Sequence, residues 1–137
     1  MKDWNALSDA EFRAEIRGFV EGNLPSNLRN HPRRIPRWET TREWFLTLSA
    51  HGMLVPNWPA AHGGMGLSAS KMIVYFEELE RWGVPRIYDM GLYMLGPILI
   101  RHGTDAQKRE YLPRILSGEH RWAQGYSEPG AGSDLAS

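Results

Sequence analysis

Residues whose types and spacing could bind a ligand are concentrated in segment 124–134 of this 137-residue chain. Within it, Ser127 opens a Ser-Glu-Pro sequence, a Gly-Ala-Gly turn follows, and Ser133 stands directly after the turn. This order places several backbone N–H groups and two hydroxyls on one tight loop, which suits a flat, polar-edged ring or a phosphate. Most glycine-rich loops are plain connections with glycines at positive φ. The longer string is more specific than Gly-Ala-Gly alone, so we interpret it as a binding loop.

A second glycine-rich segment spans residues 56–66 and contains Gly63, Gly64 and Gly66. Three glycines in four positions could cradle an anion, but no Lys follows them to make a P-loop and no strand-like run precedes them. We therefore interpret this segment as a loop that leads into a helix capped by Ser68.

Titratable side chains offer weaker candidates. The five histidines show no metal-ligand spacing, so we predict no metal site. His51 and His102 each precede a glycine at an expected helix end, where a cation stabilises the helix dipole. Glu77, Glu78 and Glu80 could form an acid/base pair, but a run of this kind is more typical of a solvated helix face. We assign no catalytic residue within this chain.

Helix signals organise the remainder of the chain. Three capping boxes pair a hydroxyl residue with Glu or Gln three positions later, and apolar residues recur at helical spacing in four stripes. The boxes are Ser8/Glu11, Thr40/Glu43 and Thr104/Gln107, and the stripes are Phe12, Ile16, Phe19 and Val20; Trp44, Phe45 and Leu48; Met72, Tyr75, Phe76 and Leu79; and Tyr111, Leu112, Ile115 and Leu116.

Two further segments complete the predicted fold. Segment 86–102 is apolar on nearly all faces, which predicts a central helix packed on several sides, kinked or divided at Pro97 because proline lacks an N–H. Segment 25–37 is polar and proline-bearing, so we expect an exposed connection. Residues 121–126 alternate as a strand does, and an unpaired strand exposes its polar backbone, so more sheet should follow.

The predicted fold class is therefore all-α. We expect an up-down bundle of five to six helices in residues 1–120, followed by the first strand of a truncated β domain in residues 121–137.

Composition excludes several functions. Lys plus Arg and Asp plus Glu number 16 each, with no basic stripe, so nucleic acid is not an expected partner. The absence of cysteine excludes disulfides and thiolate chemistry. The longest apolar stretch, from Met90 to Ile100, falls far short of the roughly 20 residues that span a bilayer, and the N-terminus lacks the apolar core of a signal peptide. We therefore predict a cytoplasmic protein without a membrane span.

Three motifs occur in order along the chain: Gly-Gly-Met-Gly at 63–66, Gly-Thr-x-x-Gln-Lys…Tyr-Leu-Pro…Gly-Glu within 103–119, and the Ser-Glu-Pro…Gly-Ser-Asp loop at 127–134. Together they make the chain, from about residue 8 onward, resemble the N-terminal part of an acyl-CoA dehydrogenase. The resemblance implies a helical N-terminal domain, a middle β domain and a C-terminal helical bundle, with FAD between the last two.

The resemblance also implies cofactor contacts. Gln124, Tyr126 and Ser127 should approach the flavin ring, with the Ser127 hydroxyl or N–H near its reactive edge. Ser133 should contact the cofactor or the phosphate region of acyl-CoA. Donors at these places would stabilise the anionic reduced flavin.

The reaction implied for an acyl-CoA dehydrogenase is removal of the α proton of an acyl-CoA by a carboxylate while the β hydride passes to flavin N5. The electrons usually leave to an electron-transfer flavoprotein. The acyl chain should pack on the central helices near Asp89, Met90 and Tyr93. The resemblance further implies a role in fatty acid metabolism (β-oxidation) and a homo-oligomer at full length.

The catalytic Glu of the family belongs to the C-terminal domain. We therefore expect that this chain alone neither holds FAD tightly nor oxidises acyl-CoA. The alternative function is a non-catalytic helical subunit, or an acyl-CoA- or partner-binding module, of a split flavoenzyme.

Overall fold

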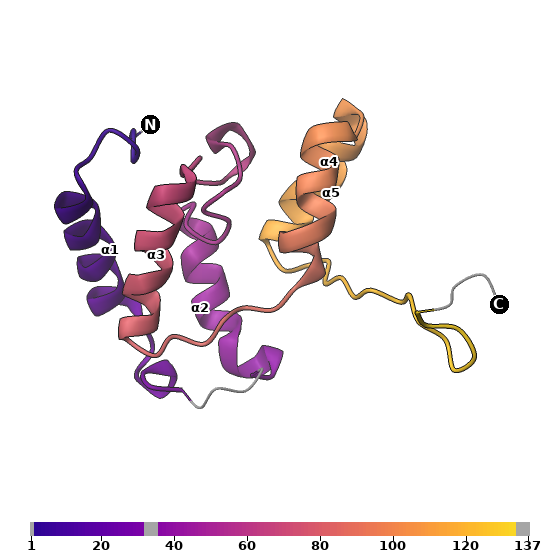
Figure 1. Ribbon diagram of the computed structural model, residues 1–137, viewed down its shortest axis with the longest axis horizontal. Helices are drawn as coiled ribbons and strands as arrows, with labels where there is room; N and C mark the ends of the chain where they lie inside the picture. Colours follow the sequence, from indigo (N-terminus) through magenta and orange to yellow (C-terminus); the bar gives the residue numbers. More distant parts are fainter. Residues whose placement is uncertain (1, 32–35, 134–137) are drawn as a thin grey trace.

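The computed structural model describes residues 2–31 and 36–133, and within them the fold is helical. As Figure 1 shows, α1, α2 and α3 form one group, α4 and α5 form a second, and the chain after α5 extends away from both. The predicted all-α bundle is confirmed. The α-helices are α1 (Asp9–Asn23), α2 (Trp38–Ala50), α3 (Ala69–Arg81), α4 (Gly96–His102) and α5 (Asp105–Leu116), joined by 3-10 turns at Ser26–Leu28 and Ala60–His62 and a π-helical stretch at Gly91–Leu95.

Two of the three predicted capping boxes are confirmed, at the starts of α1 and α5, and Ser68 caps α3 by accepting from the Lys71 N–H. The box at Thr40 is wrong, because α2 begins earlier, at Trp38, and its N-cap makes no side-chain hydrogen bond. The earlier start lets the Trp38 ring pack edge-on against Phe45, with ring centroids 5.1 Å apart. Aromatic packing therefore overrides the local capping signal.

The predicted apolar stripes form one core. Nine side chains in them are fully or almost fully buried and the other six pack partly buried around these. Residues outside the helices also contribute: Leu28 is buried, although segment 25–37 was expected to be exposed, and the Asn30 N–H donates to the Trp82 carbonyl at 3.0 Å. The expectation of an exposed connection is therefore wrong at Leu28, and residues 32–35 of it lie outside the described part.

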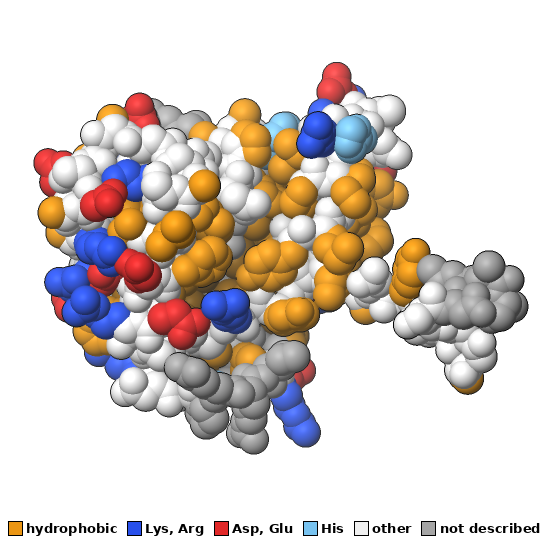
Figure 2. Space-filling view, viewed as in Figure 1, with side chains coloured by type: hydrophobic (Ala, Val, Ile, Leu, Met, Phe, Trp, Pro, Cys, Tyr) orange, Lys and Arg blue, Asp and Glu red, His pale blue; other side chains and the backbone are white. Residues whose placement is uncertain are grey.

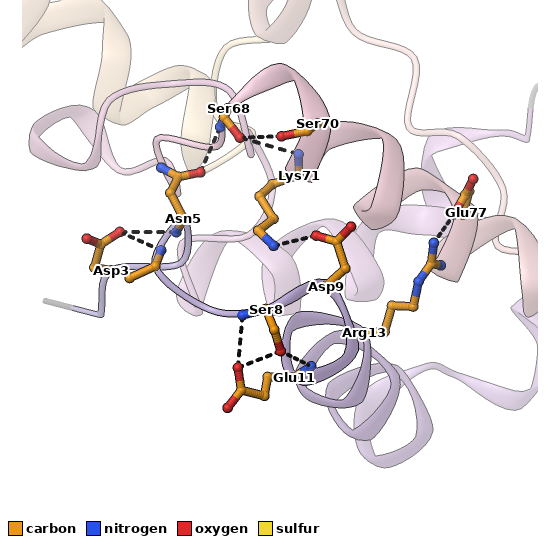
Figure 3. Close-up of polar contacts among 11 residues, drawn as sticks. Asp3, Asn5, Ser8, Asp9, Glu11, Arg13, Ser68, Ser70, Lys71 and Glu77 are labelled. Carbon is orange, nitrogen blue, oxygen red and sulfur yellow. Dashed lines mark hydrogen bonds and ion pairs between the residues drawn. The ribbon is translucent and has the colours of Figure 1, made fainter.

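The interface between α1 and α3 is polar as well as apolar. Figure 3 shows the Lys71 ammonium against the Asp9 carboxylate, 2.5 Å apart, and Arg13 against Glu77. Beside them Glu78 is fully buried, with its carboxylate paired to arginines on both helices. The interpretation of the glutamate run as a solvated face is therefore wrong for Glu78.

Segment 86–102 does not form one buried helix. The chain is extended up to Tyr88, turns π-helical at Gly91–Leu95, and continues as α4, whose first turn contains Pro97. The boundary predicted at the proline is confirmed. The expected packing on several sides is wrong, since Tyr93, Met94 and Ile98 are 53%, 44% and 55% exposed.

Close packing against tryptophan rings explains why the π-helical stretch begins with Gly91 and is followed by Gly96. A Cβ added at Gly96 would lie 1.9 Å from Cζ2 of Trp58, and one at Gly91 would lie 2.8 Å from Cδ1 of Trp122. The same approach lets the Trp58 indole N–H donate to the Leu92 carbonyl at 3.1 Å. Two tryptophans from distant parts of the chain thus fix this helical segment in place.

Residues 121–126 are extended but form no strand, so the predicted first strand is wrong for the described structure. A strand requires a hydrogen-bonded neighbour, and the described residues contain only an isolated bridge between Glu128 and Ala131. The segment is tied to the helices at its start, where the Met90 N–H donates to the Trp122 carbonyl at 3.3 Å.

Candidate functional site

An apolar cavity of about 210 Å³ lies between α2, α3 and the segment that leads into the π-helical stretch. Figure 2 shows apolar side chains gathered in the middle of this face, between the α1–α3 group and the α4–α5 pair. The cavity is lined by Trp44, Leu48, Leu54, Val55, Pro56, Asn57, Met72, Tyr75, Phe76, Leu79, Glu80, Val84, Pro85, Arg86, Ile87, Leu92 and Tyr93. Such a lining suits a hydrocarbon group.

Polar groups of the cavity lining fall into two kinds. The side chains of Glu80 and Arg86 are 51% and 71% exposed and form an ion pair of 3.4 Å in contact with solvent. Inside, the Tyr75 hydroxyl donates to the Met53 carbonyl at 2.8 Å, and burial raises the pKa of this phenol well above its usual value. Tyr75 is therefore a fixed, neutral hydrogen-bond donor and not a proton-transfer group.

The three residues predicted to contact an acyl chain occupy different surroundings. Tyr93 lines the cavity, and its ring lies 6.4 Å from that of Tyr88. Met90 is half-buried at the start of the helical segment and does not line the cavity. Asp89 is buried, and both of its carboxylate oxygens accept hydrogen bonds from this chain, one from the Gly91 N–H at 2.7 Å and one from Arg121. Tyr93 is thus the member of the set that faces open apolar space.

The residues predicted to contact the cofactor lie on the extended segment that follows α5. Gln124, Tyr126, Ser127 and Ser133 are all exposed, Tyr126 to 67%. Paired backbone groups of Glu128 and Ala131, at 2.8 and 3.1 Å, close the tight turn between the two serines. The loop projects from the helices in Figure 1, and its final Asp134 lies outside the described residues.

Two side chains of this loop are exposed and have no polar partner among the described residues. Within the described part of the chain, the side chains of Tyr126 and Ser127 make no hydrogen bond, so an aromatic ring and a hydroxyl are free to contact a ligand. The loop supplies no enclosing wall of its own. No group of three or more potential metal ligands occurs among the described residues.

Sequence reasoning missed Arg121. This residue joins the chain at 121–133, the loop segment, to residues 84–93, the cavity segment, several of which line the cavity. Its guanidinium contacts the Asp89 carboxylate and lies 4.0 Å from the centroid of the Trp38 ring. Nothing in its local sequence distinguishes Arg121 from a surface arginine, because its partners are far away in the chain. The signal was present only at Asp89, an acidic residue in an otherwise apolar run.

Fold and site together define a helical domain with an apolar cavity, followed by an exposed glycine-containing segment at residues 127–133, called the glycine loop below. A family model for the N-terminal domain of acyl-CoA dehydrogenases matches residues 8–119. The chain belongs to the acyl-CoA dehydrogenase family, and the resemblance seen in its motifs is confirmed. No helix among the described residues has both the length and the apolar character required to cross a membrane.

Individual relatives support the same assignment. The chain is 42% identical over 134 residues to acyl-CoA dehydrogenase IpdE1 of Mycobacterium tuberculosis, covering 93% of this chain and 35% of that protein. It is 36% identical over 111 residues to the mitochondrial isovaleryl-CoA dehydrogenase of Oryza sativa, covering 79% of this chain and 25% of the relative. The chain therefore spans about a third of the length of the first of these relatives and a quarter of the second.

Solved structures share the fold. A structure titled Tcur3481-Tcur3483 steroid ACAD matches 99% of this chain and 36% of its own with a TM-score of 0.71 and 39% sequence identity. The ChsE4-ChsE5 complex from Mycobacterium tuberculosis matches 99% of this chain and 34% of its own with a TM-score of 0.71 and 32% identity.

Proposed function

We propose that this chain is the N-terminal portion of an FAD-dependent acyl-CoA dehydrogenase that converts an acyl-CoA thioester into its α,β-unsaturated product. The observation that carries the proposal is the apolar cavity that Tyr93 helps to line. The chain that leads from α5 into the glycine loop is hydrogen-bonded to the same helical segment, from the Met90 N–H to the Trp122 carbonyl. An acyl chain held in the cavity and a cofactor held at the loop would then lie on neighbouring parts of one domain.

Each predicted residue has a distinct task in this proposal. Tyr93 packs against the acyl chain, and Met90 lies at the start of the helical segment that bears Tyr93. Asp89 accepts from the Gly91 N–H and so holds the backbone of that segment in place. Gln124 and Tyr126 contact the edge of the cofactor ring. Their roles are to bind and orient, and to keep water from the reacting carbons.

The serines of the loop supply hydrogen bonds. The Ser127 hydroxyl or N–H donates toward the part of the ring that gains negative charge on reduction, and such donors are most effective where water is excluded. Ser133 donates to a phosphate or to the cofactor itself. Bound FAD would supply the electron acceptor for the β hydride.

Deprotonation at the α carbon needs a base, and we assign that role to none of the described residues. The most buried carboxylate, Glu78, is committed to three arginines on the far side of α3 from the cavity. The proposal therefore assigns the base to another part of the complete enzyme, and the chain alone is inactive. The proposed partners are acyl-CoA, an electron-transfer flavoprotein as acceptor, and further copies in a homo-oligomer.

A second candidate is that the chain contributes to a split, two-subunit flavoenzyme. The specific observation in its favour is that two similar solved structures have titles that pair two gene products, Tcur3481-Tcur3483 and ChsE4-ChsE5. One of these titles names a steroid enzyme, which makes a bulky ring-bearing acyl group the first substrate class to test beside a short branched one.

Absorbance and mass measurements test both candidates. The complete protein that carries residues 1–137 is purified and its flavin spectrum, intact mass and subunit composition are recorded. One polypeptide with stoichiometric flavin and acyl-CoA oxidation supports the first candidate, and two different polypeptides support the second. A complete protein that binds no flavin and oxidises no acyl-CoA contradicts both.

A variant pair tests the cavity itself. Tyr93→Ala should raise KM for the preferred acyl-CoA more than tenfold, because a ring facing the cavity is removed. Ile73→Ala is the matched control, since Ile73 is 63% exposed on α3 and does not line the cavity. Equal kinetics for the two variants would contradict the cavity as the acyl site.

A further inference from the structure

Arg121 stands where the chain leaves the helices for the glycine loop. Its Nε donates to a carboxylate oxygen of Asp89, whose side chain is only 2% exposed. Its guanidinium carbon Cζ lies 4.0 Å from the centroid of the Trp38 ring and 5.9 Å from that of Phe45. A planar, permanently charged group is therefore held by a carboxylate and by two aromatic rings, which restricts its orientation.

The carboxylate that holds Arg121 also holds the cavity segment. The second oxygen of Asp89 accepts from the Gly91 N–H at 2.7 Å, and its backbone carbonyl accepts from the Leu92 N–H at 3.1 Å. Asp89 thus fixes the first turn of the π-helical stretch that carries Tyr93. One buried side chain contacts both the cavity segment and the loop segment.

The described chain makes its last contacts with the helices at the next residue, Trp122, whose ring packs edge-on against Tyr111 of α5 with ring centroids 6.1 Å apart. Next to Arg121, the Trp122 carbonyl accepts from the Met90 N–H at 3.3 Å, and within the described residues no hydrogen bond joins 123–127 to the helical body. Ser127 follows Trp122 by five positions, a reach of up to roughly 17 Å in an extended chain. The direction in which the loop leaves is therefore set at Arg121 and Trp122.

We propose that Arg121 and Asp89 form a positioning clamp, which fixes the glycine loop relative to the cavity segment that bears Tyr93. The inference rests on the proposed function, in which the loop contacts FAD and the cavity receives the acyl chain. Neither residue touches the reacting atoms. Both act by setting the relative placement of two ligand-binding segments, where a shift of about 1 Å can cost 100-fold in rate.

A plain stabilising ion pair would behave differently from a clamp. Lysine at position 121 would keep the positive charge beside Asp89, and so most of the stability of the pair, but it lacks the planar fork and the flat face that stacks on Trp38. Arg121→Lys is therefore the diagnostic variant. Arg121→Met leaves the buried carboxylate unpaired, and the double variant Asp89→Asn/Arg121→Met removes both charges and keeps the site foldable.

The experiment uses the complete flavoprotein that carries this domain. The visible absorption spectrum of bound flavin, the Kd for FAD, and kcat and KM are measured for these variants and for Glu78→Gln, the control that destabilises α1 and α3 without touching the clamp. Hydrogen–deuterium exchange at Met90 is followed in the same proteins without FAD.

Three results are expected of a clamp. Arg121→Lys and the double variant should weaken FAD binding about tenfold and alter the flavin spectrum, while their melting temperatures stay near or above that of Glu78→Gln. Exchange at the Met90 amide should accelerate about tenfold or more in the double variant, because this amide donates to the carbonyl of Trp122, the residue next to Arg121. Glu78→Gln should leave the spectrum, Kd and local exchange unchanged.

Opposite results overturn the inference. An unchanged spectrum and an FAD Kd within twofold of the original in Arg121→Lys and the double variant would reduce the pair to a structural contact. Failure of the unmodified protein to bind FAD would contradict the proposed function instead. In that case unchanged exchange at Met90 in the double variant would separately contradict the clamp.

Discussion

Replacing the buried carboxylate of Glu78 should destabilise the protein more than any other single charge change on α3. The carboxylate accepts from Arg13 at 3.1 Å and from two nitrogens of Arg17 at 3.2 Å each, and Arg81 lies 3.5 Å away. Burial alone would raise the pKa of Glu78, but the hydrogen bonds from Arg17 and Arg13 outweigh it, so that the pKa lies below the ordinary value of 4.5. The charged form is therefore the one that stabilises the fold.

The magnitude follows from what Glu78→Gln leaves behind. Hydrogen bonds to charged groups contribute about 1.5–3 kcal/mol each, but the three guanidiniums are 34%, 39% and 60% exposed and regain water when the charge is removed. The amide keeps one acceptor and turns its NH₂ toward other donors. We expect a net loss of about 2 kcal/mol, which lowers the melting temperature by roughly 8 °C in a domain of this size.

The assay is thermal unfolding followed by circular dichroism at several pH values. Because the folded-state pKa is lowered, the unfolded state takes up a proton first as the pH falls. The stabilisation is thus fully present above pH 4.5, the ordinary value for Glu, and is lost as the pH falls through the folded-state pKa. The difference between the original protein and Glu78→Gln should be constant near neutral pH and shrink in acid.

The neighbouring Glu77→Gln is the matched control. Glu77 is 52% exposed and pairs with Arg13 alone, so its loss should cost less than about 1 kcal/mol. Equal melting temperatures for the Glu77 and Glu78 variants at neutral pH, or a difference that does not shrink in acid, would refute this account of the buried cluster.

Three other changes have defined outcomes. Gly96→Ala should cost about 1–3 kcal/mol by overpacking and shift tryptophan fluorescence to the red, because its Cβ would overlap the Trp58 ring; an unchanged spectrum and stability would contradict the close contact. Ser8→Ala removes an N-cap and should cost about 1 kcal/mol, measured by urea unfolding, whereas Ser8→Thr should cost little. Tyr93→Phe should keep KM within about twofold if the ring packs against an acyl chain and its hydroxyl plays no part.

The sequence predicted helix starts correctly where the capping interaction joins residues that are close together in the chain. Capping at Ser8 and Thr104 depends on residues three positions away, and both boxes form. Thr40 carries the same signal and fails, because Trp38 gains more by packing on Phe45 than the helix gains from a cap. Sequence spacing cannot rank these two contributions, since the second depends on where a distant ring lies.

Buried charge was harder to predict for the same reason. Glu77, Glu78 and Glu80 look alike in sequence, yet Glu78 points between α1 and α3 and the other two are exposed to solvent. The useful signal was the pair Arg13 and Arg17 on α1, four positions apart and so on one helix face. It becomes informative only once α1 is known to pack against α3.

The candidate site was predictable as a set of motifs but not as a geometry. Motif matching identified the glycine loop and the segment around Tyr93, and the structure adds that Asp89 connects them through Arg121. An acidic residue within an apolar run favours a buried partner over a surface role, because an isolated buried carboxylate is costly. That argument indicates a cation for Asp89 from the sequence alone, although it cannot identify which one.

Segment 86–102 has apolar side chains that the helices of this domain leave exposed. Leu92 and Leu99 are buried against the core, whereas Tyr93, Met94 and Ile98 are close to or more than half exposed. A soluble surface rarely keeps such a row of large apolar side chains without a partner. In the proposed enzyme this row faces the acyl chain and the remainder of the protein, so polar replacement of Ile98 should leave the stability of the 137-residue chain unchanged and weaken assembly of the complete flavoenzyme. A loss of stability in the isolated chain would show instead that the row packs within this domain.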